Sequence, residues 1–319
     1  MPVERIPLFK PASEFFDEAG YLAANEDVRK HVTAGGFKSG LDHFQQYGKN
    51  ETHRQVFLGE NERIREFRMS KLSRLEQFFR KDMDCQLVEG KPSYLTEQLL
   101  ELADIPSEGA SSQNGYDKYI YELIESLPDG LLLDCGAGLR PEYFSNVVNF
   151  EISNTASTDV LGVGEDLPFV EGTFDAVISM TVLEHVKDPF KCAAEIVRVL
   201  KPGGKLLCCV PFLQPQHGFP NHYYNMTAQG LRALFEGSLT IDNHIVTPWG
   251  KPIVALTWLV REWCNGLSEN DKRQFLKLSL STFLKDYSEF LDASYVKNLS
   301  EAKNFELAAS TYLTATKPI

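Results

Sequence analysis

From residue 130 onward, short apolar runs with the composition of strands alternate with helical patterns. The strand candidates are 131–135, 147–152, 159–162, 174–180, 205–210 and 241–246. The clearest helix between them is 191–200, and a last strand candidate, 308–316, follows a helical insertion over about 262–305. Because parallel neighbours need long crossover connections, this alternation predicts an α/β fold with a parallel sheet covered by helices.

A helical region is predicted ahead of this pattern. Short helices are expected within 13–54, and 60–83 has the apolar stripe of a long amphipathic helix. The stripe suits packing on the main domain or self-association, for instance into a homodimer. The Pro- and Ser-containing stretch 85–115 predicts a linker or cap. The expected parts are residues 1–84, 85–115 and 116–319.

Charge is divided unevenly between these parts. The chain has 44 acidic and 32 basic side chains, a formal net charge of -12, and residues 1–84 hold 14 of each. The excess on 85–319 argues against duplex nucleic acid and an anionic membrane surface as partners. No apolar run approaches the ~20 residues of a membrane span, and no secretory signal pattern is visible. With six scattered cysteines and no C-x-x-C pair, a cytoplasmic location with reduced thiols is expected.

The strand candidate 131–135 runs into a Gly-rich turn, D-C-G-A-G-L-R-P. Gly136 and Gly138 place no side chain where the backbone bends or approaches a ligand. A nicotinamide-type G-x-G-x-x-G would need a third glycine where Pro141 stands, so dinucleotide binding is disfavoured. Glu151 ends the next strand candidate, 17 residues after Asp134. An acid at that place can accept hydrogen bonds from both ribose hydroxyls of a nucleoside.

Three further motifs follow in order: G-V-G-E-D-L-P-F from 162, F-D-A-V-I-S-M-T-V-L-E-H-V from 174 and R-V-L-K-P-G-G-K from 198. With the Gly-rich turn and Glu151, this series resembles class I S-adenosylmethionine-dependent methyltransferases of the type 11-like group. The resemblance implies a Rossmann-like sheet of seven strands, the last one antiparallel. It also implies S-adenosylmethionine as cofactor and S-adenosylhomocysteine as product. The chain departs from the family at Val163, often Asp there, and in the shortness of its glycine turn.

The resemblance also implies roles for individual residues. Asp134 and the two glycines would contact the methionine moiety, Glu151 would hold the ribose, and 163–167 would line the adenine. A helix-capping role for Asp134 and a solvated strand end for Glu151 stay open as alternatives. The cofactor-binding candidates are Asp134, Cys135, Gly136, Gly138, Glu151, Ile152, Gly164, Glu165, Asp166, Leu167, Met180 and Thr181.

Methyl transfer to oxygen requires removal of the acceptor's proton, and a histidine suits that task. The catalytic candidates are His185, His217 and His222, although His185 equally suits a structural role at a helix start. The segment 213–227 follows the fifth strand candidate, and strand ends form the ligand crevice in such sheets. Its composition suits a polyhydroxylated or phenolic acceptor. The substrate-binding candidates are Phe219, Tyr223, Tyr224 and Asn225.

A divalent metal is not expected. Some O-methyltransferases hold one with E-x-x-E-H and a later His or acid. Here Thr181 replaces the first ligand of that motif, which leaves a reduced set of Glu184, His185 and His217 as the alternative.

The stretch 16–51 resembles a small helical module that recurs beside bacterial glycosyltransferases and sugar-modifying enzymes. Its pattern is F-D-x-x-x-Y-L-x-x-N-x-D-V, then H-F, then Y-G-x-x-E. A plain helical cap is the alternative. The preferred hypothesis is therefore an O-methyltransferase acting on a sugar, glycan or other small hydroxylated acceptor. A quinone or lipid acceptor, another small metabolite, and a catalytically silent cofactor-binding scaffold are the alternatives.

Overall fold

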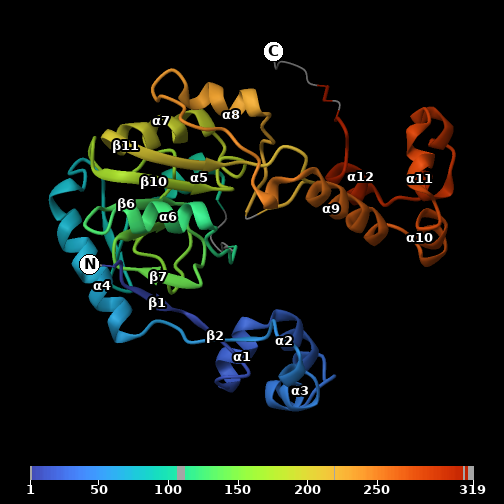
Figure 1. Cartoon of the computed structure of the whole chain (residues 1–319), viewed down its shortest axis with the longest axis horizontal. Helices are drawn as coiled ribbons and strands as arrows, with labels where there is room; N and C mark the ends of the chain where they lie inside the picture. The colour runs from blue at the N-terminus through green and yellow to red at the C-terminus, as the bar shows by residue number, and fades with distance from the viewer. Residues whose placement is uncertain (1, 106–111, 219, 312, 315–319) are drawn as a thin grey trace. The chain divides into compact units, whose positions relative to one another are not determined.

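The computed structural model describes residues 2–105, 112–218, 220–311 and 313–314. The chain divides into two compact units, Met1–Cys209 and Val210–Ile319. The first unit contains the sheets, and the described part of the second is helical with long connecting loops (Figure 1).

A seven-stranded mixed sheet forms the centre of the first unit. Its strands are β4 (Gln86–Val88), β5 (Lys91–Ser93), β6 (Leu132–Cys135), β8 (Val147–Glu151), β9 (Val160–Leu161), β10 (Phe174–Met180) and β11 (Leu200–Cys209). Their order is β11-β10-β6-β8-β9-β5-β4, and only the β4–β5 pair is antiparallel. The predicted α/β class and the Rossmann-like sheet of seven strands are confirmed, but the antiparallel strand is β4, the first of these strands along the chain rather than the last.

Two of the seven strands come from a part of the chain where none was predicted. The predicted strand 241–246 is a loop whose Ile245 and Val246 are exposed, and the described residues of 308–316 form no strand. The sheet is instead extended by β4 and β5, which a two-residue turn connects. Glu89 and Gly90 of that turn both have positive φ, 51° and 78°, as a type I′ hairpin requires. The prediction was wrong because an apolar run does not reveal whether a sheet edge is available to it.

Three helices accompany the sheet: α7 (Pro189–Val199) lies at the predicted helix 191–200, whereas α5 (Glu97–Ala103) lies within 85–115, where a linker or cap was predicted. Helix α6 (Lys118–Ser126) begins at Asp117, whose side chain accepts the backbone N–H groups of the first turn, and it buries Ile120 and Ile124 in the core. Helix α7 begins with proline after the Asp188 cap and buries its apolar face.

The connection between β6 and β8 contains no helix. It includes only β7 (Glu142–Phe144), which pairs antiparallel with β1 (Arg5–Pro7) from the N-terminus. Helix α4 (Glu62–Leu75) packs at this place, and its buried Lys71 donates to the carbonyl oxygens of Phe144 (3.3 Å) and Val147 (2.5 Å). The helix predicted over 60–83 is thus shorter than expected and ends in a 3-10 turn. Of the two roles expected for it, packing on the main domain is the one that the structure shows.

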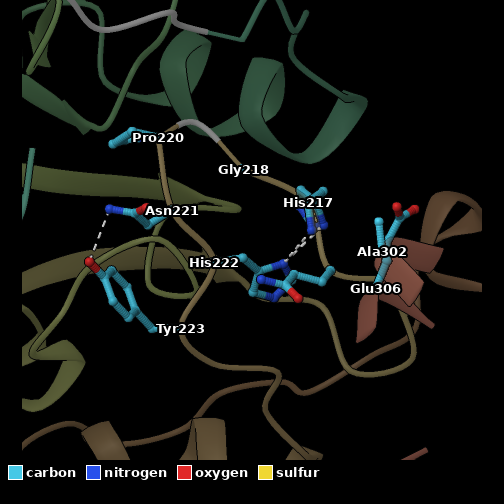
Figure 2. Close-up of a pocket in the computed structure, with 9 residues that line it drawn as sticks. His217, Gly218, Pro220, Asn221, His222, Tyr223, Ala302 and Glu306 are labelled. Carbon is cyan, nitrogen blue, oxygen red and sulfur yellow. Dashed lines mark hydrogen bonds between the residues drawn. The ribbon is translucent and has the colours of Figure 1, made fainter. Parts of the chain in front are cut away.

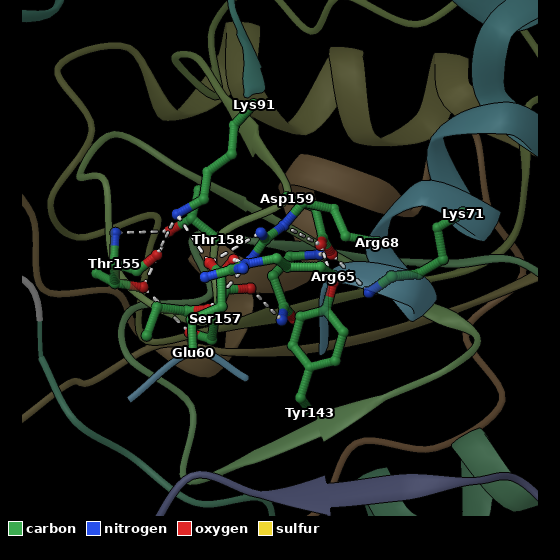
Figure 3. Close-up of polar contacts among 12 residues, drawn as sticks. Glu60, Arg65, Arg68, Lys71, Lys91, Tyr143, Thr155, Ser157, Thr158 and Asp159 are labelled. Carbon is green, nitrogen blue, oxygen red and sulfur yellow. Dashed lines mark hydrogen bonds and ion pairs between the residues drawn. The ribbon is translucent and has the colours of Figure 1, made fainter. Parts of the chain in front are cut away.

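Two further charged contacts bind α4 to the sheet. Figure 3 shows Lys71 and Arg68 converging on Asp159, at 2.6 and 3.4 Å, with the hydroxyl of Tyr143 donating to the same carboxylate. Arg68 also pairs with Glu60 at 2.9 Å. Because Asp159 and Lys71 are fully buried, these pairs make the N-terminal helix part of the sheet's core rather than a surface attachment.

A small module precedes α4, and its motif residues hold it together. Asp17 caps the first helix, Tyr21 contacts His43 Nδ1 at 3.0 Å, and Asn25 donates to the Gln55 carbonyl at 2.8 Å. Its elements are β2 (Phe9–Pro11), α1 (Glu18–Ala24), α2 (Glu26–Thr33), α3 (Gly40–Gln46) and β3 (Gln55–Phe57). These contacts show that the residues of the sequence pattern stabilise the fold of the module. An association with glycan-modifying enzymes stays a prediction.

The second unit contains the helices predicted over 262–305, but they do not interrupt the sheet, because the strands predicted on either side of them do not form in the described residues. Its helices are α8 (Ala228–Phe235), α9 (Pro252–Asn265), α10 (Glu269–Phe275), α11 (Ser294–Lys297) and α12 (Glu301–Glu306). Trp263 stacks on Phe275 with ring centroids 5.3 Å apart. Residues 210–319 carry 10 basic and 10 acidic side chains, whereas 85–209 carry 8 and 20, so the entire net charge lies on the sheet region. Within the described residues, the helices are too short or too polar to cross a bilayer.

Candidate functional site

The predicted cofactor-binding residues gather at one edge of the sheet. Asp134 and Cys135 end β6, Glu151 ends β8, and Thr181 directly follows β10. These strands are parallel neighbours, so their carboxyl ends meet at the same edge, where open α/β sheets bind ligands.

The glycine turn after β6 brings bare backbone to this edge. Gly136 and Gly138 have φ of 81° and 64°, a region that side chains other than glycine rarely adopt. A Cβ at Gly136 would lie 2.5 Å from the Val182 side chain, and one at Gly138 would lie 2.5 Å from the Ser112 carbonyl oxygen. Glycine is therefore required at both positions by close packing as well as by φ.

Two residues that the sequence did not single out as functional donate hydrogen bonds to the Asp134 carboxylate. Arg140 donates from Nε to Oδ2 at 2.7 Å and from Nη2 to Oδ1 at 3.1 Å, and the Tyr116 hydroxyl donates to Oδ2. The guanidinium lies over the Tyr116 ring, 4.5 Å from its centroid. Burial, reinforced by the charge of Asp134, raises the pKa of Tyr116 well above its ordinary value, so Tyr116 remains a donor. Asp134 thus accepts three hydrogen bonds from residues around the turn, and about one of its four acceptor positions remains for a ligand.

Glu151 is buried at the end of β8 and faces the glycine turn. Its Oε2 accepts the Gly138 N–H at 2.6 Å, and its Oε1 accepts the Ile152 N–H at 2.9 Å. Burial raises the pKa of Glu151, while these backbone donors oppose the shift. Its Oε1 also accepts the Ser153 N–H at 3.4 Å. An ionised carboxylate has about four acceptor positions, so Glu151 keeps about one for a ligand hydroxyl.

The residues after β9 are largely occupied by protein contacts. A Cβ at Gly164 would lie 2.7 Å from Cys192 Sγ of α7, so this glycine is needed for packing. Asp166 pairs with Arg80 at 2.6 Å, and the Leu167 N–H donates to Glu195 at 2.8 Å. Glu165 is buried, which raises its pKa, and it accepts the Lys187 N–H at 3.2 Å. Only backbone and side-chain edges of this segment remain for an adenine.

Unusual features cluster after β10. Thr181 has a φ of 55°, an outlier for a β-branched residue, and its N–H donates to the Cys209 carbonyl at 2.8 Å. Glu184 is fully buried, and within the described residues its carboxylate oxygens have no hydrogen-bond partner. Burial raises the pKa of Glu184 to about 8, and His185 Nε2 lies 3.8 Å from its Oε1. Strain and an unsatisfied buried acid are typical of functional sites, and neither is visible in the sequence.

In the second unit, His217 and His222 line an open pocket of about 520 Å³. Figure 2 shows the two imidazoles facing each other, with Nδ1 atoms 3.1 Å apart. Tyr223 lines the same pocket, Tyr224 is exposed, and Phe219 lies outside the described residues. The pocket is lined by Gln216, His217, Gly218, Pro220, Asn221, His222, Tyr223, Ala302 and Glu306.

Hydrogen bonds fix the tautomers of this histidine pair. The His217 backbone N–H donates to His222 Nδ1 at 3.1 Å, so that atom carries no proton and Nε2–H donates to Asn225 Oδ1 at 3.0 Å. His217 Nδ1 lies 2.9 Å from the Pro215 carbonyl, which only accepts, so its proton sits on Nδ1 and the lone pair falls on Nε2. Burial, together with His217, lowers the pKa of His222 and keeps it neutral.

Comparison with known proteins identifies the sheet region. Residues 133–208, from β6 into β11, match a family model described as a methyltransferase domain. The chain is 26% identical over 148 residues to a tRNA U34 carboxymethyltransferase of Campylobacter fetus, covering 42% of this chain and 50% of that protein. It is 42% identical over 59 residues to a demethylmenaquinone methyltransferase of Renibacterium salmoninarum, covering 18% and 24%. A solved methyltransferase from Aquifex aeolicus is 14% identical with a TM-score of 0.30, covering 47% of this chain and 87% of that one.

These matches define a class of domain. Residues 133–208 form a methyltransferase domain, and the sheet order around it is that of the Rossmann-like class. The chain spans about half the length, or less, of the curated relatives that it matches. The two relatives named above differ in the acceptor that their names give, a tRNA in one and demethylmenaquinone in the other.

Proposed function

We propose that the protein is an S-adenosylmethionine-dependent methyltransferase that modifies an oxygen of a sugar, glycan or other small hydroxylated acceptor. The observation that carries the enzyme class is the methyltransferase domain, whose glycine turn and buried Glu151 meet at the ligand edge of the sheet.

The residues present suit the cofactor. The positive φ of Gly136 and Gly138 sets the shape of the turn beside Glu151, and Glu151 keeps an acceptor position for a ribose hydroxyl. When bound, S-adenosylmethionine supplies a methyl group on a sulfonium that leaves readily, so the protein chiefly aligns and desolvates the reactants. The -12 charge of the sheet region also suits a cationic ligand.

The acceptor is proposed to occupy the pocket of the second unit. Most of its lining side chains are polar, among them Gln216, Asn221 and Tyr223, and Pro220 and Ala302 are its apolar members. Such a lining supports a hydroxylated acceptor over a quinone or lipid, because an apolar ligand would cover these polar groups without pairing them. The acidic sheet region argues against a nucleic acid acceptor.

His217 is proposed as the proton acceptor. With S-adenosylmethionine bound as methyl donor, His217 Nε2 would accept the proton that the acceptor hydroxyl loses on methylation. The Pro215 carbonyl holds the ring in the required tautomer. His222, Tyr223, Tyr224 and Asn225 remain proposed members of the acceptor site, His185 of the first unit stays a catalytic proposal, and no metal is proposed.

Calorimetry on the full chain with S-adenosylhomocysteine tests the enzyme class, with a dissociation constant in the micromolar range expected. Absence of binding at millimolar ligand would reject the enzyme. A methyl-transfer screen over sugars, phenols and lipids then tests the acceptor, and turnover confined to lipids would reject the hydroxylated small acceptor. A cytoplasmic location stays part of the proposal, supported by the free state of all six cysteines.

A further inference from the structure

The glycine turn lacks the helix that ordinarily follows such a turn in a βαβ unit, so something else must hold its shape. From Gly136 to Asn146 the described structure contains only the short strand β7. A crossover helix would hold the chain that leaves the turn in a regular hydrogen-bonded element. Here side chains meet that requirement.

We propose that Arg140 is a positioning residue that holds the glycine turn in the shape that receives the cofactor, acting through Asp134 and Ser157. This inference rests on the proposed function. Arg140 is 3% exposed, and its guanidinium bonds both oxygens of Asp134, which is 0% exposed. The pair clamps the two ends of the turn, because Asp134 precedes the glycines and Arg140 follows them.

A second link runs through the backbone of Arg140. Its N–H donates to Ser157 Oγ at 3.0 Å, and that hydroxyl donates to the Gly138 carbonyl at 3.2 Å. The Gly138 N–H in turn donates to Glu151 Oε2 at 2.6 Å. A displacement of Arg140 would therefore reach the acid proposed to hold the ribose through Gly138.

Arg140 and its neighbour Leu139 also connect residues 112–116 to the turn by hydrogen bonds. Arg140 Nη1 donates to the Asn114 carbonyl at 3.0 Å, and the Leu139 N–H donates to the Ser112 carbonyl at 2.8 Å. Tyr116, at the end of this segment, donates to Asp134, and its ring stacks against the Arg140 guanidinium. Part of the predicted linker is thus built into the ligand edge.

The strength of the clamp follows from its burial. A bidentate arginine–carboxylate pair is among the stronger hydrogen-bonded contacts, and removing one partner leaves a buried charge unpaired. The backbone of Asp134 is fixed in β6 by ladder bonds on both sides. Loss of Arg140 should therefore loosen the turn before it loosens the sheet.

Three variants test the proposal against a matched control. Arg140→Met removes the clamp, Arg140→Lys keeps the charge without the fork, and Ser157→Ala removes one hydroxyl. Arg68→Met is the control, because Arg68 is also buried and paired with a buried aspartate, Asp159. The measurements are amide hydrogen exchange over 136–141, the dissociation constant for S-adenosylhomocysteine, and the melting temperature.

In Arg140→Met, the amides of Gly138, Leu139 and Arg140 should exchange about tenfold faster or more, with binding weakened to a similar degree. Arg140→Lys should lie between this variant and wild type, and Ser157→Ala should weaken binding about fivefold. Arg68→Met should lower the melting temperature and leave turn exchange and the dissociation constant unchanged.

Unchanged exchange over 136–141 in the folded Arg140 and Ser157 variants would overturn the proposal. Equal weakening of binding in Arg68→Met would also overturn it, because the effect would then be general destabilisation. If Arg140→Met does not fold, Arg140→Lys and Ser157→Ala decide the matter. Absence of binding by the wild type would instead reject the proposed function, and turn exchange would still decide whether Arg140 holds the turn.

Discussion

Lys71 Nζ of α4 lies 2.6 Å from Asp159 Oδ2, and neither side chain is accessible to solvent. One residue belongs to the N-terminal helix and the other precedes β9 at the centre of the sheet. The methyltransferase domain is thus completed by a residue more than 60 positions before its first matched residue, 133. The connection from β6 to β8 explains why, since it brings no helix of its own to this face.

Lys71→Met should destabilise the protein by about 3–5 kcal/mol, because Asp159 would remain buried with one of its charged partners removed. Chemical unfolding of the full chain measures this. Lys81→Met is the control, since Lys81 is exposed. A loss no larger than that of the control would show that α4 is not part of the core.

The same lysine should make stability depend on pH on the alkaline side. Burial, only partly offset by Asp159, lowers the pKa of Lys71 from 10.5 to about 8. Between these values the unfolded chain binds the proton and the folded chain does not, so the free energy of unfolding rises with pH. Across this window, the free energy of unfolding of the wild type should rise relative to that of Lys71→Met by about 1.4 kcal/mol per pH unit. Parallel pH profiles of the two proteins would contradict the shift.

The sequence predicted the elements that have strong local patterns. The strand 174–180 has the predicted bounds, and α7 differs from its prediction by two residues at the start and one at the end. The hairpin of β4 and β5 was missed because Pro92 lies within it and its strands are only three residues long. The loop 241–246 was mistaken for a strand because Ile245 and Val246 resemble buried residues but are exposed.

For the candidate site, sequence order located the ligand edge but not its contacts. Asp134, Gly136 and Glu151 lie where the motifs placed them. The hydrogen bonds from Tyr116 and Arg140 to Asp134 depend on a turn that no helix follows. No local sequence pattern predicts that this helix is missing. The left-handed backbone of Thr181 and the unsatisfied carboxylate of Glu184 likewise arise from packing between strands.

Glu151→Ala should weaken S-adenosylhomocysteine binding by about 1–3 kcal/mol, the usual loss for hydrogen bonds to a charged group. Calorimetry against wild type measures the change, with Glu171→Ala as control because Glu171 is exposed. An unchanged dissociation constant would remove Glu151 from the ribose role.

His217→Ala should lower turnover of the true acceptor at least a hundredfold, in line with the loss of a general base, while the dissociation constant for S-adenosylhomocysteine stays the same. Single-turnover kinetics with saturating cofactor make the measurement. His244→Ala is the control, because His244 is exposed and outside the pocket. Normal turnover in His217→Ala would assign the proton to another group.

Asn225→Asp should shift the acid limb of the turnover profile to higher pH. Asn225 Oδ1 accepts the Nε2–H of His222, and a carboxylate there would favour the imidazolium and raise the pKa of His222 from its lowered value. Protonated His222 would carry a hydrogen on Nδ1, directed at the His217 N–H that now donates to it, so the pair would lose its arrangement. Turnover should therefore fall at a pH where the wild type is still active, and recover as pH rises. Asn221→Asp is the control, since Asn221 contacts Tyr223 rather than the histidine pair in the described structure. Identical acid limbs in wild type and Asn225→Asp would show that the state of His222 does not govern the reaction.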